Sequence, residues 1–353
     1  MSYDSALKTI LDRAIAQNAS DVHIAVDKRP TLRIYGDLQP IESEEVITTQ
    51  SAEGIISELM TPQQRERFLK ERQIDFAYEG SGGVRFRVNA YFEENTWSAS
   101  LRLVPAKIQT IEELNLPPIL HTFAKLTQGF ILMVGPAGHG KSTTTAAILD
   151  EVNRTRTAHI VTIEDPIEYL YEQANGIVSQ REVGTDVLSF ADGLKTVLRQ
   201  DPDVIMVGEM RDADSIAAAM TAAETGHLVF STLHTNSAAQ TIDRIIDSFP
   251  PSQQDQIIAQ TATTVVAVVS ERLVPKIGGG RVPALEIMIT NAAIRNLIRE
   301  KKVYSIDSVI QTGLNEGMMS LNYSLAQLVK SGQITPENGE LFSNNPSELK
   351  KML

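Results

Sequence analysis

The sequence contains no cysteine, which excludes a disulfide framework and a metal site built on thiolates, and which suits a reducing compartment. Aromatic residues make up 5% of the chain, with one tryptophan, so we expect cores packed mainly by aliphatic side chains. No apolar run approaches the roughly 20 residues that a membrane span needs. Positive charge is scarce as well: the formal net charge is -12, which argues against a generally basic surface for nucleic acid.

The amino terminus lacks the pattern of a secretory signal. Asp4 stands where such a signal carries positive charge, and no apolar core follows it. The sequence therefore predicts an intracellular protein without a membrane span.

The first part of the chain predicts an α+β domain over residues 1–104. Apolar residues recur at helical spacing from Leu7 to Ile15, and the helix is expected to end near Asn18. Apolar and polar residues then alternate around 22–26, 32–34 and 74–104, which indicates antiparallel strands. Residues 105–118 begin with a proline and end with two, and they predict a linker.

The remaining residues, 119–353, predict a parallel sheet wrapped by helices. Short apolar strands are expected at 130–134, 159–163, 203–207 and 227–231, with helical segments between them. Beyond Pro250 the pattern is mostly helical, apart from an apolar pair at 271–275 and 282–289 around a triple-glycine turn.

Residues 135–142 read GPAGHGKS, a full match to the phosphate-binding pattern of a glycine, four free positions and then Gly-Lys-Ser. An apolar strand precedes this loop and a helix-prone segment follows it, as the pattern requires. Lys141 is expected to reach the β- and γ-phosphates of a nucleotide and the Ser142 hydroxyl to bind Mg²⁺. A glycine-rich turn without a ligand would leave both side chains without a duty. The predicted nucleotide-binding residues are Gly135, Pro136, Ala137, Gly138, His139, Gly140, Lys141, Ser142 and Thr143.

Carboxylates follow two of the predicted strands. Glu209 comes after the strand at 204–207, which we expect beside the phosphate loop, and it is a candidate to hold Mg²⁺ through water or to orient the attacking water. Glu164, Asp165 and Glu168 follow the strand at 159–163, where they are expected to face the ligand crevice. The alternative interpretation of these three is an acidic surface turn.

Histidines and arginines have two interpretations each. His227 and His234 bracket one strand; a structural role suits His227, and for His234 a role in sensing phosphate or positioning water stands beside a structural one. Arg85 and Arg87 share one strand face, with Arg102 on the next strand; they form either a solvated face or part of a phosphate site.

With these motifs in view, the chain resembles the secretion-type traffic ATPases and, within them, the PilT-like type IV pilus retraction ATPases. The resemblance covers nearly the whole chain. It is carried by ASDVH at 19–23, RFRVN at 85–89, the phosphate loop, TIEDPIE at 162–168, the segment 201–212, the segment 225–235 and AIRNLIRE at 293–300.

The resemblance implies a PAS-like amino-terminal domain, a RecA-like P-loop ATPase domain and a ring of six identical subunits. It implies Mg²⁺-dependent ATP hydrolysis that powers pilus retraction and twitching motility at the cytoplasmic base of the pilus, through an inner-membrane platform protein and with a paralogous retraction ATPase as a further partner. Arg85, Arg87 and Arg102 then become candidates to neutralise charge on the γ-phosphate. Ala137 and His139 depart from the family's usual Thr and Ser, at positions that the loop pattern leaves free. The region after Thr335 matches nothing specific and is expected to be helical.

Four other functions remain open. An accessory retraction paralogue is disfavoured by residues 293–300, and an assembly or secretion ATPase by the absence of a four-cysteine zinc module. A RecA-like DNA motor is disfavoured by the acidic balance. A nucleotide-gated scaffold that barely hydrolyses ATP is disfavoured by the presence of both Glu209 and Glu164.

Overall fold

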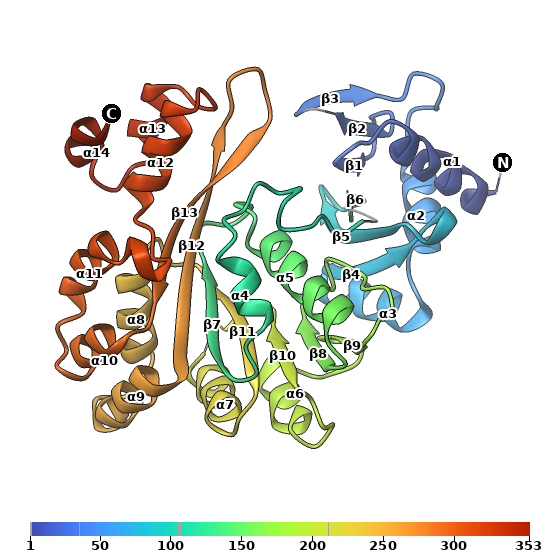
Figure 1. The fold of residues 1–353 in the computed structure, drawn as a ribbon. Helices are drawn as coiled ribbons and strands as arrows, with labels where there is room; N and C mark the ends of the chain where they lie inside the picture. The colour runs from blue at the N-terminus through green and yellow to red at the C-terminus, as the bar shows by residue number, and fades with distance from the viewer. Residues whose placement is uncertain (1, 35, 105–106, 211) are drawn as a thin grey trace. The chain divides into compact units, whose positions relative to one another are not determined.

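The computed structural model describes residues 2–34, 36–104, 107–210 and 212–353, and contacts within the chain divide it into two units (Figure 1). Unit 1 consists of Met1–Lys107 and Pro166–Leu170. Unit 2 consists of Ile108–Asp165 and Tyr171–Leu353. Each unit has its own sheet and its own core.

Unit 1 is built on an antiparallel sheet of order β3-β2-β1-β6-β5-β4. The meander expected between residues 74 and 104 is confirmed as β4, β5 and β6. β3 follows β2, and all four of its residues are exposed. Its sequence therefore lacks the alternation of apolar and polar residues that predicts a strand. The elements are α1 (Tyr3–Ala16), β1 (Asp21–Ile24), β2 (Thr31–Ile34), β3 (Asp37–Pro40), α2 (Thr49–Glu58), α3 (Pro62–Glu71), β4 (Gln73–Glu79), β5 (Arg85–Glu93) and β6 (Thr96–Leu103).

The three helices of unit 1 bury their apolar stripes together with one face of this sheet. Leu7, Ile10 and Leu11 of α1 belong to the same core cluster as Val88 and Leu101 of the strands. Phe68 of α3 stacks on Phe92 and meets the edge of Trp97, the chain's single tryptophan, with ring centroids 5.0 and 4.9 Å apart. Alternation then leaves the residues between these apolar ones, including Arg85 and Arg87, on the opposite face.

Unit 2 is built on a seven-stranded sheet of order β13-β12-β7-β11-β10-β8-β9, which confirms the predicted parallel sheet. Every neighbouring pair is parallel except β12 with β13. Its first elements are α4 (Leu120–Ala124), β7 (Gly129–Val134), α5 (Lys141–Thr155), β8 (His159–Glu164), β9 (Ile177–Glu182), α6 (Phe190–Val197), β10 (Val204–Val207), α7 (Ala213–Glu224) and β11 (Leu228–Leu233).

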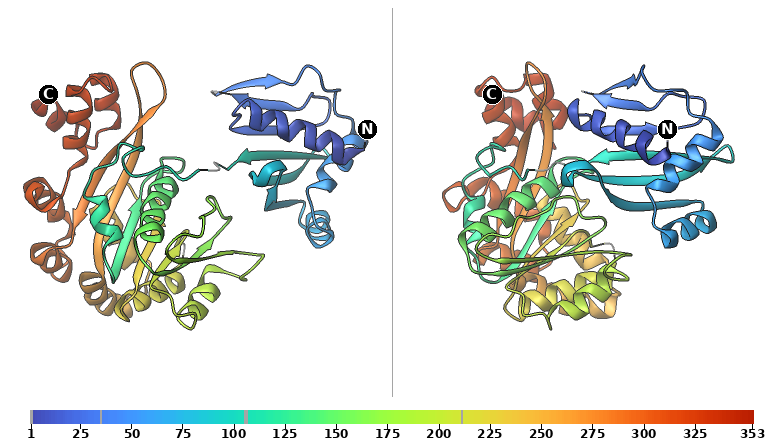
Figure 2. Two further views of the ribbon diagram at one scale, coloured as in Figure 1. Left: turned by 45° about the vertical axis from the view of Figure 1, so that its right-hand side comes forward. Right: turned by 90° about the vertical axis from the view of Figure 1, so that its right-hand side faces the viewer.

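Helices cover both faces of this sheet (Figure 2). One core cluster joins the strands to α4 and α5, and it also takes in Ile111 and Leu116 from the segment before α4. The other joins the opposite face to α6, α7, α8, α9 and α10. Because both faces are covered, the central strands β7, β10 and β11 are buried along their whole length.

Beyond Pro250 the chain adds a long hairpin and a group of helices. The hairpin begins at Val265, six residues before the expected 271, because β12 pairs with β7 through the apolar stretch that leads into it. Val274 and Val282 of the hairpin pack with Leu325 and Leu349 in a separate cluster. The elements after β11 are α8 (Ala238–Asp247), which lies before Pro250, and then α9 (Pro251–Thr264), β12 (Val265–Pro275), β13 (Arg281–Ile289), α10 (Ala292–Arg299), α11 (Ile306–Thr312), α12 (Leu321–Lys330), α13 (Pro336–Phe342) and α14 (Pro346–Met352).

Among the described residues, no helix combines the length and the apolar character needed to cross a bilayer.

Candidate functional site

The loop at 135–140 joins β7 to α5 and depends on glycine at three positions. Gly135, Gly138 and Gly140 have φ angles of 137°, 75° and 99°, which lie in the region that side chains disfavour. Gly140 is the N-cap of α5, and no side chain in the described part of the chain caps that helix start. The first N–H groups of α5 are thus left for a ligand, and the positive end of the helix favours an anion there.

Lys141 turns back over this loop from the first position of α5. It is 7% exposed, and its Nζ donates hydrogen bonds of 2.8 Å to the carbonyl oxygens of Gly135 and Pro136. The ammonium group therefore lies over the loop that the glycines shape. Ser142 and Thr143 follow in the first turn of α5 and are half-buried, whereas Ala137 is exposed at the tip of the loop.

The strand order brings the expected catalytic side chains to one edge of the sheet. β7, β11, β10 and β8 are consecutive and parallel, so their carboxyl ends lie side by side. The strand at 204–207, expected beside the phosphate loop, is β10; β11 pairs with both β7 and β10 and therefore lies between β10 and the strand that leads into the loop. His234, which follows β11, therefore sits between the loop and Glu209.

His234 contacts both of these neighbours. Its Nδ1 lies 3.4 Å from Lys141 Nζ, and its Nε2 lies 3.2 Å from Glu209 Oε1. An imidazole that carries its proton on Nε2 satisfies both contacts, since it accepts from the ammonium and donates to the carboxylate. His227, at the other end of β11, bonds through Nδ1 to the carbonyl of Ala222 and has the structural position expected of it.

Hydroxyl groups of β11 fix the turn that carries Glu209. Thr232 Oγ1 donates to the carbonyl of Gly208 at 2.6 Å, and Ser231 Oγ donates to that of Val207 at 2.8 Å. These bonds set the direction in which Glu209 leaves the strand. Arg211, two residues further on, lies outside the described residues.

Glu164 ends β8 and is buried, with a relative exposure of 6%. Its Oε1 accepts hydrogen bonds from Thr162 Oγ1 at 2.6 Å and from Gln180 Nε2 at 3.2 Å. Asp165 is exposed. Glu168 belongs to unit 1, where it forms an ion pair with Arg87 at 3.8 Å. The three carboxylates are thus held in different surroundings rather than gathered as one cluster.

The three candidate arginines lie on the face of the unit 1 sheet opposite its helices. Arg87 and Arg102 are direct cross-strand neighbours, and Arg85 is two residues from Arg87 on the same strand. Arg102 Nε donates to Asp21 Oδ1 at 2.9 Å. Their role toward the phosphate loop of unit 2 stays a prediction.

The structure adds Glu271 to the site, a residue that the sequence patterns did not single out. Its side chain is 2% exposed and accepts a hydrogen bond from Thr144 in α5. Burial raises its pKa to about 7, against the opposing effects of Thr144 and of the charge on Lys141. A charged residue within an apolar strand was the one sequence feature that could have drawn attention to Glu271. The sequence alone does not show that the phosphate loop packs against it.

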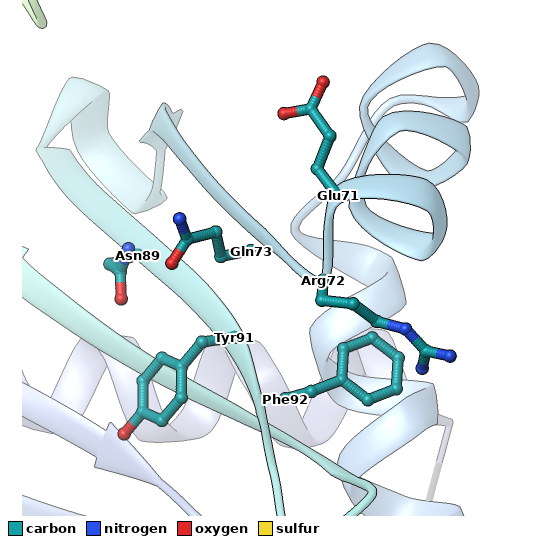
Figure 3. Close-up of a pocket in the computed structure, with 6 residues that line it drawn as sticks. All are labelled: Glu71, Arg72, Gln73, Asn89, Tyr91 and Phe92. Atoms are coloured by element: carbon teal, nitrogen blue, oxygen red, sulfur yellow. The ribbon is translucent and has the colours of Figure 1, made fainter.

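Unit 1 also has an open hollow of about 470 Å³ at the end of α3 and along β4 and β5 (Figure 3). The guanidinium of Arg72 lies over the ring of Phe92, 4.5 Å from its centroid. None of the predicted site residues lines this hollow. Its lining residues are Glu71, Arg72, Gln73, Asn89, Tyr91 and Phe92.

The chain is similar to proteins of known families. Residues 3–280 match the family model described as type II/IV secretion system protein. The type IV pilus retraction ATPase PilT of Pseudomonas aeruginosa is 46% identical over 327 residues, which cover 91% of this chain and 93% of that protein. The pilus ATPase PilU of the same organism is 35% identical over 354 residues, which cover 100% of this chain and 91% of that protein.

A solved structure gives the same result. The crystal structure of the pilus retraction motor PilT with bound ADP has a TM-score of 0.91 to this fold and a sequence identity of 42%, and the match covers 98% of both chains.

Proposed function

The chain belongs to the type II/IV secretion system protein family and, within it, to the PilT-like pilus retraction ATPases, and from this premise we propose that it hydrolyses ATP to retract a type IV pilus. The observation that carries the proposal is the row of contacts from Lys141 through His234 to Glu209. This row joins a phosphate-binding cation to a carboxylate that can act on water.

The loop and the start of α5 are proposed to hold the phosphates. Backbone N–H groups of residues 135–143 bind the phosphate oxygens, and Lys141 exchanges its carbonyl partners for the β- and γ-phosphates. Ser142 and, through water, Glu209 offer the oxygen donors that Mg²⁺ prefers. A Mg²⁺ ion held by these residues would supply positive charge that neutralises the phosphates.

Glu209 is proposed to orient the attacking water and to accept its proton. Glu164 lies on β8, the strand that pairs with β10; it accepts hydrogen bonds from Thr162 of its own strand and Gln180 of β9, and it supports the same step. His234 links the Lys141 ammonium to the Glu209 carboxylate. Loss of the γ-phosphate therefore changes the charge at one end of this row and is felt at the other.

The arginines and the wider assembly complete the proposal. Arg85, Arg87 and Arg102 neutralise charge that develops on the γ-phosphate, as arginine fingers do. Unit 1 is proposed to be the PAS-like domain expected over 1–104, and unit 2 the RecA-like domain expected over 119–353. The units differ from these bounds, because residues 166–170 belong to unit 1 and residues 108–118, expected as part of a linker over 105–118, belong to unit 2; residues 105–106 lie outside the described residues. Six copies form a ring at the cytoplasmic base of the pilus, where an inner-membrane platform protein and a paralogous ATPase are its partners.

Substitution of Lys141 tests the site. We expect K141A to lower MgATP turnover by at least about 100-fold, because an ammonium in a water-poor site stabilises transition-state charge far more strongly than in water. Phosphate release from the purified protein measures this. Exposed Lys125, substituted as K125A, is the matched control and is expected to keep its turnover. Intact turnover in K141A would refute the assignment.

Deletion of the gene tests the direction of the motor. Loss of pilus retraction together with an excess of surface pili supports the proposal, whereas cells without pili indicate an assembly ATPase. The similarity to PilU along the whole chain makes an accessory retraction ATPase the second candidate. Complementation separates the two: a main motor restores retraction in cells that lack both paralogues.

A further inference from the structure

Strand β12 contacts the phosphate loop at two of its residues, Glu271 and Leu273. A Cβ atom on Gly135 would lie 2.3 Å from the carbonyl oxygen of Glu271, and one on Gly140 would lie 2.3 Å from its Oε1. Two residues further along, the N–H of Leu273 donates to His139 Nδ1 at 3.0 Å. The backbone of this strand and the side chain of Glu271 therefore limit how closely the loop can approach the strand.

The surroundings of the Glu271 carboxyl group act in opposite directions on its ionisation. The Thr144 hydroxyl and the charge on Lys141 favour its ionised form. Burial favours the neutral form, and Oε2 has no hydrogen-bond partner among the described residues. The neighbouring strand β7 presents only buried apolar residues.

Other charged groups reach the loop rather than this carboxyl. Arg281 Nη1 lies 3.5 Å from the carbonyl oxygen of Gly138, and the Arg272 side chain donates to Phe342 and Asn344 instead. Burial and the charges on Arg281, Lys141 and Arg272 lower the pKa of His139, which suits the acceptor role of its Nδ1. Lys141 is therefore the one cation among the described residues that acts directly on Glu271.

We propose that Glu271 is a positioning residue for nucleotide binding: it supports Gly140 and Thr144 from beneath when neutral, and it opposes the bound phosphates when ionised. This inference rests on the proposed ATPase function. Neutral Glu271 leaves the charge of Lys141 to the nucleotide. Ionised Glu271 competes for that charge and places a negative group under the site where the phosphates bind.

Two variants separate support from charge. E271A removes the side chain that lies against the loop. We expect the KM for MgATP to rise by roughly tenfold with a smaller change in kcat, because the position of the loop affects nucleotide binding first. E271Q keeps the shape and the hydrogen bond to Thr144 without a titrating group. It is expected to restore KM to within about twofold of wild type at about pH 6.

The dependence of KM on pH distinguishes a titrating role of Glu271 from a merely structural one, because a structural role would leave this dependence unchanged. We expect the wild-type KM to rise by several-fold between about pH 6 and about pH 8.5, and the rise to be clearly smaller in E271Q. L285A is the matched core control: Leu285 is the cross-strand partner of Glu271 and fully buried. It is expected to lower the melting temperature while keeping the wild-type KM profile.

The outcomes distinguish this inference from the proposed function. Identical KM profiles in wild type and E271Q, or a tenfold rise of KM in L285A as well, would overturn the role of Glu271 while leaving the ATPase in place. Turnover that survives in K141A would overturn the ATPase site itself. If E271A does not fold, the comparison of E271Q with wild type still decides the question.

Discussion

His234 is the residue whose contacts reach furthest across the site, because it touches the phosphate-binding lysine and the candidate base at once. We expect H234A to lower kcat by about tenfold to 100-fold, the range typical of a residue that orients another functional group. The affinity for ADP is expected to change little, since the loop is left intact.

Measurement of kcat by phosphate release and of ADP affinity by calorimetry checks this expectation. H159Q is the control, because His159 begins β8 and bonds to Ser179 and to the carbonyl of Asp201 at the amino end of that strand. If H234A binds ADP poorly and keeps its kcat, His234 shapes the loop and takes no part in the reaction step.

Glu286 makes the stability of the fold depend on pH. Burial raises its pKa to about 7; the Ala238 N–H and Arg272 act against this and Asp307 with it. Between pH 4.5 and about 7 the folded protein holds a proton that the unfolded chain releases. The free energy of unfolding therefore falls as the pH rises through this window and levels off above it.

Between about pH 5.5 and about pH 7.5 the loss from this one group is about 2 kcal/mol, and E286Q is expected to remove it. Urea unfolding of both proteins at the two pH values measures the difference. Exposed Glu66, changed to glutamine, serves as control. An equal pH dependence in wild type and E286Q would mean that Glu286 ionises normally in the folded state.

At the scale of elements, the contact between the loop and β12 is so close that replacing a glycine of the loop by alanine tests it. In G135A the new Cβ meets the backbone of Glu271, which cannot turn away as a side chain can. We expect loss of nucleotide binding and destabilisation by about 3 kcal/mol or more, from overpacking and the unfavourable φ together.

Gly278, in the hairpin turn, is the matched position, because its φ is also positive and nothing lies within 4 Å of a Cβ built there. G278A should therefore cost only about 1 kcal/mol and leave ADP binding unchanged. Thermal unfolding and ADP titration compare the two. Equal effects would show that the φ angle, and not the contact with β12, sets the cost.

The sequence predicted those elements whose signals are local. The loop, its flanking strand and helix, and the strands that lead to Glu164 and Glu209 are predicted from motif and hydrophobicity. β9 was missed because four of its six residues are polar, and it is a strand because β8 offers it a partner. The order of β7, β11 and β10, and the place of Glu271 under the loop, depend on contacts between distant segments, which no local pattern contains.

At the scale of the whole molecule, the arginines of unit 1 and the lysine of unit 2 offer a test of whether an active site is shared between copies. We expect R87A and K141A each to be nearly inactive. If the protein forms the proposed ring and an arginine acts on the nucleotide of a neighbouring copy, mixtures of the two variants regain a fraction of the turnover, because some interfaces join an intact loop to an intact arginine.

Turnover of the two proteins, measured alone and after mixing under exchange conditions, decides this. R67A is the control, since Arg67 lies on α3 and pairs with Glu71. Recovery on mixing supports sites completed by a neighbour. Inactivity of the mixture, with rings formed normally, would place the arginine and its nucleotide within one chain.

The long strand β12 links two regions that the sequence keeps apart. Alternate residues of a strand face opposite ways, so Glu271 and Leu273 meet the phosphate loop while Arg272 between them bonds to the carbonyl of Phe342 and to Asn344 beyond α13. β12 is paired with β13 along most of its length, and we expect this pairing to keep the strand straight and rigid. If nucleotide binding displaces the loop, we therefore expect the displacement to reach the last helices of the chain through this strand.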